Sequence, residues 1–427
     1  MNAHCQSQLF QFWSQLSENE KKALQIQIEH IDEATLKRQR ALIKEKDKIL
    51  SLTEKESLEP FDDFGQSGNK EDRQRGEQLI AEGRLGCVLV AGGQGTRLQF
   101  SGPKGCYPIS VVHHKSLFQL FAERVVVAGK RAGRLLSVAI MTSPDNDEET
   151  RQFFQTHHYF GLKPEQIAFF VQETLPLLDE EGSLFLKSPW EIAVGPDGNG
   201  HLLVQFAKAG ILSQWVARGI EHVHIVLVDN PLADPFDPEL LGYHDRKKAE
   251  ITLKCIERID PEESVGVIVR KNGKIAVLEY SEMTCGEKQA RLTDQKLKHR
   301  CANISLFCFS LAFIARMFQA KQQLPLHVAK KSALCVDQAG KTHLSDRPIA
   351  WKFETFIFDW LKYAESSAAI IFPRQSCFSP LKNLNGENSP ATVKKALFER
   401  DRQIVRELTG LEPSSFPFEL PAEFYNF

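Results

Sequence analysis

The stretch LVAGGQGTRLQFSGPKG at residues 89–105 decides the fold prediction, because it leads out of the apolar run GCVLV at 86–90. A short apolar run of this kind predicts a buried strand. Glycines after the strand let the backbone approach a phosphate closely, and the backbone N–H groups of such a turn bind anions. Arg97 and Lys104 add positive charge to the loop. The stretch therefore predicts a strand that ends in a phosphate-binding loop.

The same strand pattern recurs along the chain. Further apolar runs are SVAIM (137–141), IAFFV (167–171) and HIVLV (224–228), with helical segments expected at 116–134 and 146–158. Strands that alternate with helices are typical of parallel α/β sheets, in which ligands bind beyond the carboxyl ends of the strands. Later in the chain we expect a hairpin within 265–282 that turns at Asn272-Gly273, and amphipathic helices at 351–365 and 390–408.

Composition narrows the class of protein. The chain has 427 residues, 42% of them apolar, and a formal net charge of -2. This balance allows a sizeable core and gives no overall attraction to nucleic acid or membrane. The nine cysteines are scattered and contain no C-x-x-C pair, which favours reduced thiols and a cytoplasmic protein. We read no signal peptide and no run long enough to span a bilayer.

Three phosphate-loop patterns compete for the glycine stretch. A Walker A loop requires Ser or Thr after its lysine, whereas Gly105 follows Lys104. A dinucleotide fingerprint requires a third glycine where Leu98 stands, which disfavours a dinucleotide-dependent oxidoreductase. The pattern G-G-x-G-T-R-L followed by P-K, found in nucleotidyltransferases, is matched at Gly92, Gly93, Gly95, Thr96, Arg97, Leu98, Pro103 and Lys104.

With these motifs the sequence resembles the eukaryotic-type UDP-N-acetylhexosamine pyrophosphorylases, within the wider UDP-sugar pyrophosphorylases. The resemblance continues in the same order from about residue 86 to about 383. The other matching segments are MTS (141–143), FF (153–154), FGLKPEQIAFFVQETLP (160–176), GPDGNG (195–200), VDNPLADPFDPELLGY (228–243), ESVGVI (263–268), LEYSE (278–282), CANISLF (301–307), LHVAKK (326–331), WKFETFIFDW (351–360) and FSPLKN (378–383).

The resemblance implies a fold and a reaction. The expected fold is α/β, with a Rossmann-like nucleotidyltransferase mixed sheet flanked by helices, an N-terminal helical segment and a short C-terminal region. We expect boundaries at 1–80, 81–380 and 381–427, with the catalytic domain in the middle. The implied reaction joins UTP and a sugar 1-phosphate into a UDP-sugar and pyrophosphate by in-line attack on the α-phosphate. The partners are then these small molecules, and the oligomeric state stays open.

Candidate residues for the phosphates and a metal come from charged positions. By resemblance, Arg97 binds the leaving pyrophosphate, Lys104 lies near the α-phosphate and Lys352 holds the sugar phosphate. One of Lys330 and Lys331 joins Lys352, and Lys331 is preferred. Asp229 follows the strand HIVLV, and a carboxylate at that end of a strand is a natural Mg²⁺ ligand, although a turn or helix cap is also common for Asp. No second metal ligand is assigned.

The remaining candidates concern the nucleoside and the sugar. The nucleotide-binding set is Ala91, Gly92, Gly93, Gly95, Thr96, Gln172 and Gly198, with Gln172 suited to the uracil edge. The implied sugar-binding set is Asn199, Gly266, Glu279, Tyr280 and Asn303. Carboxylates and amides pair well with hydroxyl groups, whereas each residue taken alone is as well explained by a structural role.

The sequence also departs from the family pattern near the implied sugar side. His201 and Glu173 replace common glycines, Pro231 follows VDN where an aliphatic residue is usual, and Trp351 precedes Lys352. These departures leave the sugar open. N-acetylglucosamine 1-phosphate is implied by PDGNG, and the alternatives are glucose 1-phosphate or a broad range of sugars. A non-catalytic nucleotide-sugar binding protein is a further alternative, which would be expected to lack the charged residues Arg97, Lys104, Asp229 and Lys352.

Overall fold

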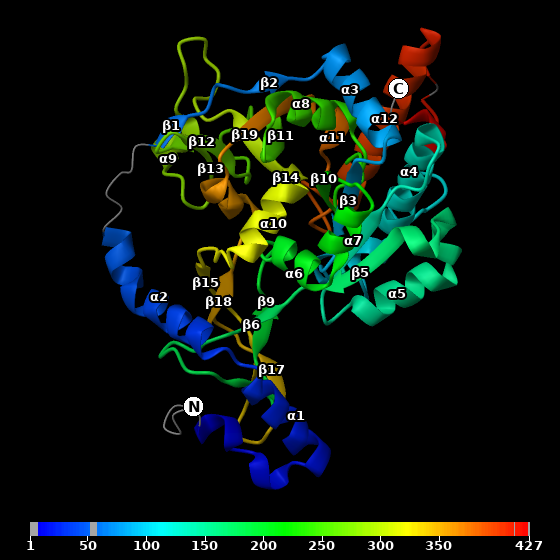
Figure 1. Cartoon of the computed structure of the whole chain (residues 1–427). Helices are drawn as coiled ribbons and strands as arrows, with labels where there is room; N and C mark the ends of the chain where they lie inside the picture. The colour runs from blue at the N-terminus through cyan, green and yellow to red at the C-terminus, as the bar shows by residue number, and fades with distance from the viewer. Residues whose placement is uncertain (1–6, 52–57, 414, 426–427) are drawn as a thin grey trace. The chain divides into compact units, whose positions relative to one another are not determined.

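The apolar runs of the sequence become neighbouring parallel strands in the computed structural model, which describes residues 7–51, 58–413 and 415–425 (Figure 1). These strands are β3 (Leu85–Val90), β4 (Val138–Thr142), β5 (Ile167–Val171) and β10 (His222–Leu227). They lie in the order β10-β3-β4-β5, and every neighbouring pair is parallel. Their carboxyl ends therefore meet at one edge of the sheet, as the sequence predicted.

The chain forms two compact units, each built from separated segments. Unit 1 comprises Met1–Glu56, Glu173–His201 and Gln323–Asp359, and unit 2 comprises Ser57–Gln172, Leu202–Gln322 and Trp360–Phe427. This grouping follows spatial contacts, whereas the predicted boundaries 1–80, 81–380 and 381–427 follow sequence and stay a prediction.

The large sheet of unit 2 is mixed. Its main order is β2-β19-β11-β14-β10-β3-β4-β5, with β14 antiparallel to both of its neighbours β10 and β11. The additional strands are β1 (Leu58–Pro60), β2 (Gly65–Gln66), β11 (Ile251–Glu257), β12 (Val267–Lys271), β13 (Lys274–Leu278), β14 (Cys301–Ser310) and β19 (Ser367–Phe372). β12 and β13 form the predicted hairpin, and Asn272 and Gly273 take positive φ angles of 51° and 78°, as its tight turn requires.

Helices of unit 2 flank this sheet. They are α3 (Lys70–Ala81), α4 (Leu117–Ala132), α5 (Asp147–Thr156), α6 (Leu202–Lys208), α7 (Ile211–Ala217), α8 (Pro238–Lys247), α9 (Cys285–Gln289), α10 (Leu311–Gln319), α11 (Arg374–Cys377) and α12 (Pro390–Thr409), with 3-10 turns η4 (Thr96–Leu98), η5 (Lys104–Cys106), η6 (His158–Gly161), η7 (Pro164–Gln166) and η9 (Ala422–Phe424). The helices predicted at 116–134, 146–158 and 390–408 are confirmed as α4, α5 and α12. A mixed sheet with flanking helices is the predicted fold class.

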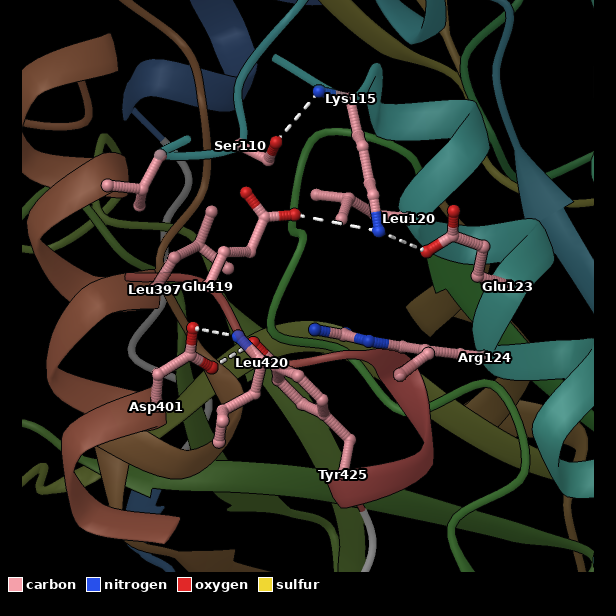
Figure 2. Close-up of a pocket in the computed structure, with 12 residues that line it drawn as sticks. Ser110, Lys115, Leu120, Glu123, Arg124, Leu397, Asp401, Glu419, Leu420 and Tyr425 are labelled. Carbon is pink, nitrogen blue, oxygen red and sulfur yellow. Dashed lines mark hydrogen bonds and ion pairs between the residues drawn. The ribbon is translucent and has the colours of Figure 1, made fainter. Parts of the chain in front are cut away.

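The segment after α12 packs onto α4 and the loop before it (Figure 2). The Glu419 carboxylate accepts hydrogen bonds from the backbone N–H groups of Val112 and His113, both at 3.1 Å. Tyr425 donates its hydroxyl hydrogen to the buried Asp401 of α12, and its ring lies 4.7 Å from the Arg124 guanidinium carbon. The C-terminal segment thus packs against α4 and α12 of unit 2.

Unit 1 is built from short antiparallel pairs and two helices. The pairs are β6 (Thr174–Pro176) with β9 (Val194–Pro196), β7 (Leu186–Ser188) with β8 (Glu191–Ile192), β15 (His327–Lys331) with β18 (Ala350–Glu354), and β16 (Leu334–Val336) with β17 (Thr342–Leu344). The 3-10 turns η2 (Ser7–Phe10) and η3 (Trp13–Gln15) precede α1 (Glu18–Glu29) and α2 (Glu33–Ser51). Leu9, Leu24, Leu184 and Phe353 belong to their shared apolar core.

The prediction of an amphipathic helix at 351–365 is wrong. Residues Ala350–Glu354 form strand β18, and a 3-10 turn, η8, follows at Ile357–Tyr363. Trp351 and Phe353 point into the core of unit 1, while the alternate residues Lys352 and Glu354 are partly exposed. This alternation has the period of two that is typical of a strand. Pairing with β15 therefore outweighs the helical spacing of the apolar residues that follow, on which the prediction was based.

Two findings concern the class of protein. Among the residues that the structure describes, no helix is long and apolar enough to cross a membrane. The described cysteines are free thiols, and Cys87, Cys255, Cys301, Cys308 and Cys377 are buried. Cys5 lies outside the described residues.

Candidate active site

The glycine loop folds back on itself at the carboxyl end of β3. The Lys104 N–H donates to the Gly93 carbonyl at 3.0 Å, and the Gly95 N–H donates to the Gly102 carbonyl at 3.0 Å. These bonds bring the lysine beside the first glycines, and a Cβ atom added to the exposed Gly93 would meet only the Lys104 side chain, at 4.0 Å. The loop therefore presents backbone and an amine on one accessible surface, as a phosphate site requires.

Residues from the two neighbouring strand ends hold the loop in place. Asn146, in the turn after β4, donates its amide to the Ala91 carbonyl at 3.0 Å and to the Gly93 carbonyl at 3.3 Å. Gln172, directly after β5, lies so close that a Cβ atom on Gly92 would stand 2.7 Å from its Oε1. Gln172 thus lies against the loop, and its contact with a uracil base stays a prediction, whereas Asn146 was not among the predicted site residues. The sequence feature that could have identified Asn146 is its position in a polar turn after a predicted strand.

Gly95 and Thr96 are placed differently from the first two glycines. Gly95 is buried against Phe100, where a Cβ atom would stand 2.8 Å from the ring, so its visible role is packing. Thr96 begins the turn η4 and is exposed, as is Arg97 next to it. Contacts of Gly95 and Thr96 with a nucleotide stay a prediction.

A lysine and an aspartate form the charged centre of the site. Lys104 Nζ lies 3.8 Å from Asp229 Oδ2, and the two side chains are only 16% and 14% exposed. Asp229 follows β10, the strand beside β3, so the parallel register brings these residues together. The other carboxylate oxygen, Asp229 Oδ1, is buried and has no hydrogen-bond partner among the described residues.

The electrostatics of this centre involve a third cation. Burial lowers the pKa of Lys104 from its ordinary value, Asp229 opposes that shift, and the charges of Arg97 and Lys382 lower the pKa further. Lys382 comes from FSPLKN, and the adjacent Leu381 N–H donates to the Asp229 carbonyl at 2.7 Å. FSPLKN is one of the segments that resemble the family, but Lys382 was not among the predicted site residues. The three cations repel one another, so the site is suited to a ligand that carries several negative charges.

The predicted sugar residues of unit 2 gather around Gly266. The Asn303 N–H donates to the Gly266 carbonyl at 2.8 Å, and a Cβ atom on Gly266 would stand 3.0 Å from Glu279 Oε1. Tyr280 follows Glu279 and is 41% exposed, while Asn303 is buried. The structure therefore places the Glu279 carboxylate and the Asn303 backbone beside Gly266, and sugar binding by Glu279, Tyr280 and Asn303 stays a prediction.

Unit 1 carries the predicted glycine and asparagine of PDGNG. Gly198 has a positive φ of 83°, and a Cβ atom there would stand 2.1 Å from the Thr355 carbonyl oxygen, so only glycine fits. The Asn199 side-chain oxygen accepts a hydrogen bond from the Ile357 N–H at 3.0 Å. The loop is thus fixed to the segment after β18, and Asn199 already has a structural role.

The strand pair β15–β18 carries the predicted phosphate lysines. Ala329 lies opposite Lys352, and Lys330 lies opposite Trp351. Opposed residues share a face, as do residues two apart, so Lys331 is on the face of Lys352 and Lys330 is on the other face. Lys352 Nζ is 2.8 Å from Glu354 Oε1, whereas Lys330 forms an ion pair with Glu180. The register thus favours Lys331 as the second phosphate ligand.

The donor set at the end of β10 fits a hard divalent cation. Mg²⁺ prefers oxygen ligands and binds through one or two carboxylates together with substrate phosphates. Asp229 offers a buried carboxylate oxygen that none of the described protein groups hydrogen-bonds, beside a loop suited to phosphates. An α/β sheet that carries a glycine loop, a cluster of cations and this carboxylate is typical of a nucleotidyltransferase, an enzyme that binds nucleotide phosphates.

Comparison with known proteins assigns the family. A family profile described as UTP–glucose-1-phosphate uridylyltransferase matches residues 21–406. The chain is 34% identical to UDP-N-acetylglucosamine diphosphorylase 2 of Arabidopsis thaliana, over 90% of this chain and 78% of that protein. It is also 34% identical to UDP-N-acetylglucosamine pyrophosphorylase of Saccharomyces cerevisiae, over 92% and 87%. A crystal structure of the Trypanosoma brucei UDP-N-acetylglucosamine pyrophosphorylase superposes with a TM-score of 0.77 at 26% identity, over 93% and 85%.

The chain belongs to the UTP–glucose-1-phosphate uridylyltransferase family. It is accordingly an enzyme of the UDP-sugar pyrophosphorylase class, which acts on nucleotide and sugar phosphate small molecules.

Proposed function

We propose that this enzyme makes UDP-N-acetylglucosamine and pyrophosphate from UTP and N-acetylglucosamine 1-phosphate, with Mg²⁺ bound at Asp229. The observation that carries the proposal is the Lys104–Asp229 centre with its unpartnered carboxylate oxygen, placed beside the glycine loop. The names of the Arabidopsis and yeast relatives support the choice of sugar.

The proposed reaction is an in-line displacement at phosphorus. A phosphate oxygen of the sugar 1-phosphate attacks the α-phosphorus of UTP, a new P–O bond forms, and the bond to the β-phosphate oxygen breaks. Pyrophosphate leaves with the electron pair of that bond. Such a transfer needs positioning and charge neutralisation more than covalent catalysis by the protein.

The side chains divide this work according to their placement. The Lys104 amine, which lies beside Asp229 while the Lys104 backbone is bonded to the Gly93 carbonyl, neutralises charge on the α-phosphate. Arg97 and Lys382 add positive charge for the departing pyrophosphate. Lys331 and Lys352, on one face of β15–β18, hold the phosphate of the sugar. Bound Mg²⁺ would supply further neutralisation of the phosphate charge.

Gln172 is the proposed uracil contact. Its amide stands at the end of β5, and its Oε1 lies against Gly92 of the loop. An amide can donate and accept at once, which matches the paired donor and acceptor atoms of a uracil edge. The side chain is largely buried, so a base bound there would be read by an ordered group.

The test is pyrophosphate release from UTP and Mg²⁺ with a panel of sugar 1-phosphates. We expect N-acetylglucosamine 1-phosphate to be used at least about tenfold better than glucose 1-phosphate, a difference of about 1.4 kcal/mol in transition-state binding. The opposite order would establish the glucose alternative. UTP binding without release with any sugar would leave the non-catalytic alternative.

Removing the proposed metal ligand provides a second prediction. Asp229→Asn keeps the shape of the side chain and removes its charge, so kcat should fall on the order of a hundredfold and the Mg²⁺ needed for half-maximal rate should rise. Asp234→Asn, a change to a partly buried aspartate of the same loop, serves as the control for general disturbance. An Asp229→Asn enzyme with an unchanged Mg²⁺ requirement would contradict the assignment.

A further inference from the structure

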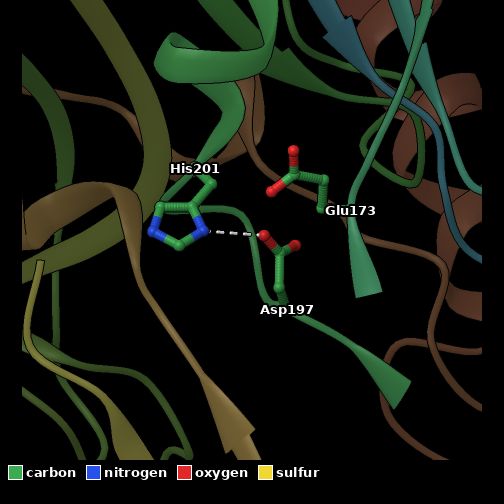
Figure 3. Close-up of side chains that lie close together, drawn as sticks. All are labelled: Glu173, Asp197 and His201. Atoms are coloured by element: carbon green, nitrogen blue, oxygen red, sulfur yellow. Dashed lines mark hydrogen bonds and ion pairs between the residues drawn. The ribbon is translucent and has the colours of Figure 1, made fainter. Parts of the chain in front are cut away.

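A second group of potential metal ligands lies in unit 1, away from any role assigned so far. It consists of Glu173, Asp197 and His201, and one ligand atom from each lies within 4.8 Å of the others (Figure 3). His201 Nδ1 is 2.8 Å from Asp197 Oδ2. In Figure 3 the Glu173 carboxylate approaches the same space from the opposite strand.

The backbone fixes the positions of the two carboxylates. Glu173 directly precedes β6 and Asp197 directly follows β9, and these strands pair with Thr174 opposite Pro196. The Asp197 N–H donates to the Glu173 carbonyl at 3.3 Å, and the Asp197 carbonyl accepts from the Thr355 N–H at 2.7 Å. Strand pairing therefore places the backbones of the two acids side by side, and from there their carboxylates reach the same space.

Burial leaves the cluster open on one side. The Asp197 side chain is 1% exposed and that of His201 is 28% exposed, while Glu173 is an exposed residue. A cation entering from solution would meet Glu173 and His201 first and reach the buried Asp197 behind them. Three protein ligands with one open side is the arrangement of zinc sites that keep a water molecule as fourth ligand.

The charges of the cluster favour a divalent cation over a proton. A protonated imidazole brings one positive charge to the two carboxylates, of which Asp197 is buried, whereas a divalent cation brings two. A divalent cation balances both, and buried charges are stable only when they are paired or bind a metal. An imidazole with two carboxylates is a borderline ligand set, which suits zinc better than magnesium or calcium.

We propose that Glu173, Asp197 and His201 form a binding site for a divalent transition-metal cation of the zinc type. Binding replaces the proton between His201 Nδ1 and Asp197 with the cation, which is then coordinated by one nitrogen and two carboxylate groups. The cation links the start of β6, the end of β9 and the residue before α6. Gly198 and Asn199 lie between two of its ligands in sequence, so the cation would hold the PDGNG turn in a fixed conformation.

The test is calorimetric titration with ZnCl₂ of the full chain, which measures binding without relying on catalysis. All proteins carry Asp229→Asn, which removes the proposed magnesium ligand. They also carry Cys335→Ser, because the Cys335 thiol lies 3.4 Å from His343 Nε2 and such a pair also binds zinc. The compared variants are Glu173→Gln and His201→Gln, and the matched control is Glu181→Gln, another exposed acid of unit 1.

We expect one saturable zinc site in the parent protein, weakened at least about tenfold by Glu173→Gln and by His201→Gln and unchanged by Glu181→Gln. Glu173 is exposed, so its substitution tests the site without disturbing the core. No saturable site in the parent, or equal affinity in all variants, would overturn the proposal. Equal weakening by Glu181→Gln would also overturn it, because general attraction by negative charge would then explain the binding. None of these outcomes bears on uridylyl transfer, which is measured separately.

Discussion

At the scale of single residues, Lys104 has the environment that decides its chemistry. The amine is mostly buried, and burial together with Arg97 and Lys382 lowers its pKa in spite of Asp229. A lysine whose pKa is lowered loses its positive charge at a lower pH than an ordinary lysine. Activity that needs this charge should therefore be full at neutral pH and decline on the alkaline side, beginning below the ordinary lysine pKa of about 10.4.

Substitution of Lys104 tests this explanation. Lys104→Ala should lower kcat on the order of a hundredfold or more, because one fixed cation at the reacting phosphate is lost. Lys104→Arg keeps a charge that does not titrate in this range, so the activity that remains should lose its alkaline decline. The measurement is pyrophosphate release as a function of pH for the three proteins. An alkaline decline that persists in Lys104→Arg would assign it to another group.

At the scale of elements, the register of β15–β18 separates two adjacent lysines. Lys331 shares a face with Lys352, whereas Lys330 lies opposite Trp351, pairs with Glu180 and stands 5.5 Å from the Trp351 ring. Lys331→Ala should raise the KM for the sugar 1-phosphate about tenfold, which corresponds to loss of one charge-assisted hydrogen bond, and leave the KM for UTP within about twofold. Lys330→Ala is the matched control and should change neither constant. Steady-state kinetics with each substrate varied gives both KM values. A raised KM for the sugar 1-phosphate in Lys330→Ala but not in Lys331→Ala would contradict the assignment.

The same elements show what could be predicted from sequence. The glycine loop, Gln172 and Asp229 were predictable, because each directly follows an apolar strand and parallel strands bring their carboxyl ends together. Lys382 was not, since its approach depends on the bond from Leu381 to the Asp229 carbonyl, across about 150 residues of chain. Strand β18 was missed for a related reason: its partner β15 and its core lie elsewhere in the sequence, and the local apolar spacing indicated a helix. Asp197 was noted only as part of GPDGNG, and Glu173 and His201 only as departures from the family pattern, because the cluster forms through the pairing of two strands that are distant in sequence.

At the scale of the whole molecule, the candidate residues of both units depend on packing by distant parts of the chain. Arg124 of α4 is buried, donates to the Ala233 carbonyl in the loop after β10 at 2.9 Å, and lies under the ring of Tyr425. The C-terminal segment thus supports the helix that packs behind the Asp229 loop. Burial raises the pKa of Asp401, and its carboxylate accepts hydrogen bonds from the Tyr425 hydroxyl and from the Leu420 N–H of that segment.

Tyr425→Phe tests whether this support contributes to stability. The substitution keeps the ring over Arg124 and removes the hydroxyl, so one oxygen of the buried Asp401 carboxylate loses its donor, which costs about 1–3 kcal/mol. We expect a lower urea midpoint for unfolding of unit 2, with kcat unchanged at temperatures where the protein stays folded. Leu411→Ala, at a side chain that is 69% exposed in the same C-terminal region, should leave the midpoint in place. Equal midpoints for Tyr425→Phe and the unmodified chain would show that the Tyr425 hydroxyl does not stabilise α4 in solution, and that the Arg124–Ala233 bond supports the Asp229 loop without it.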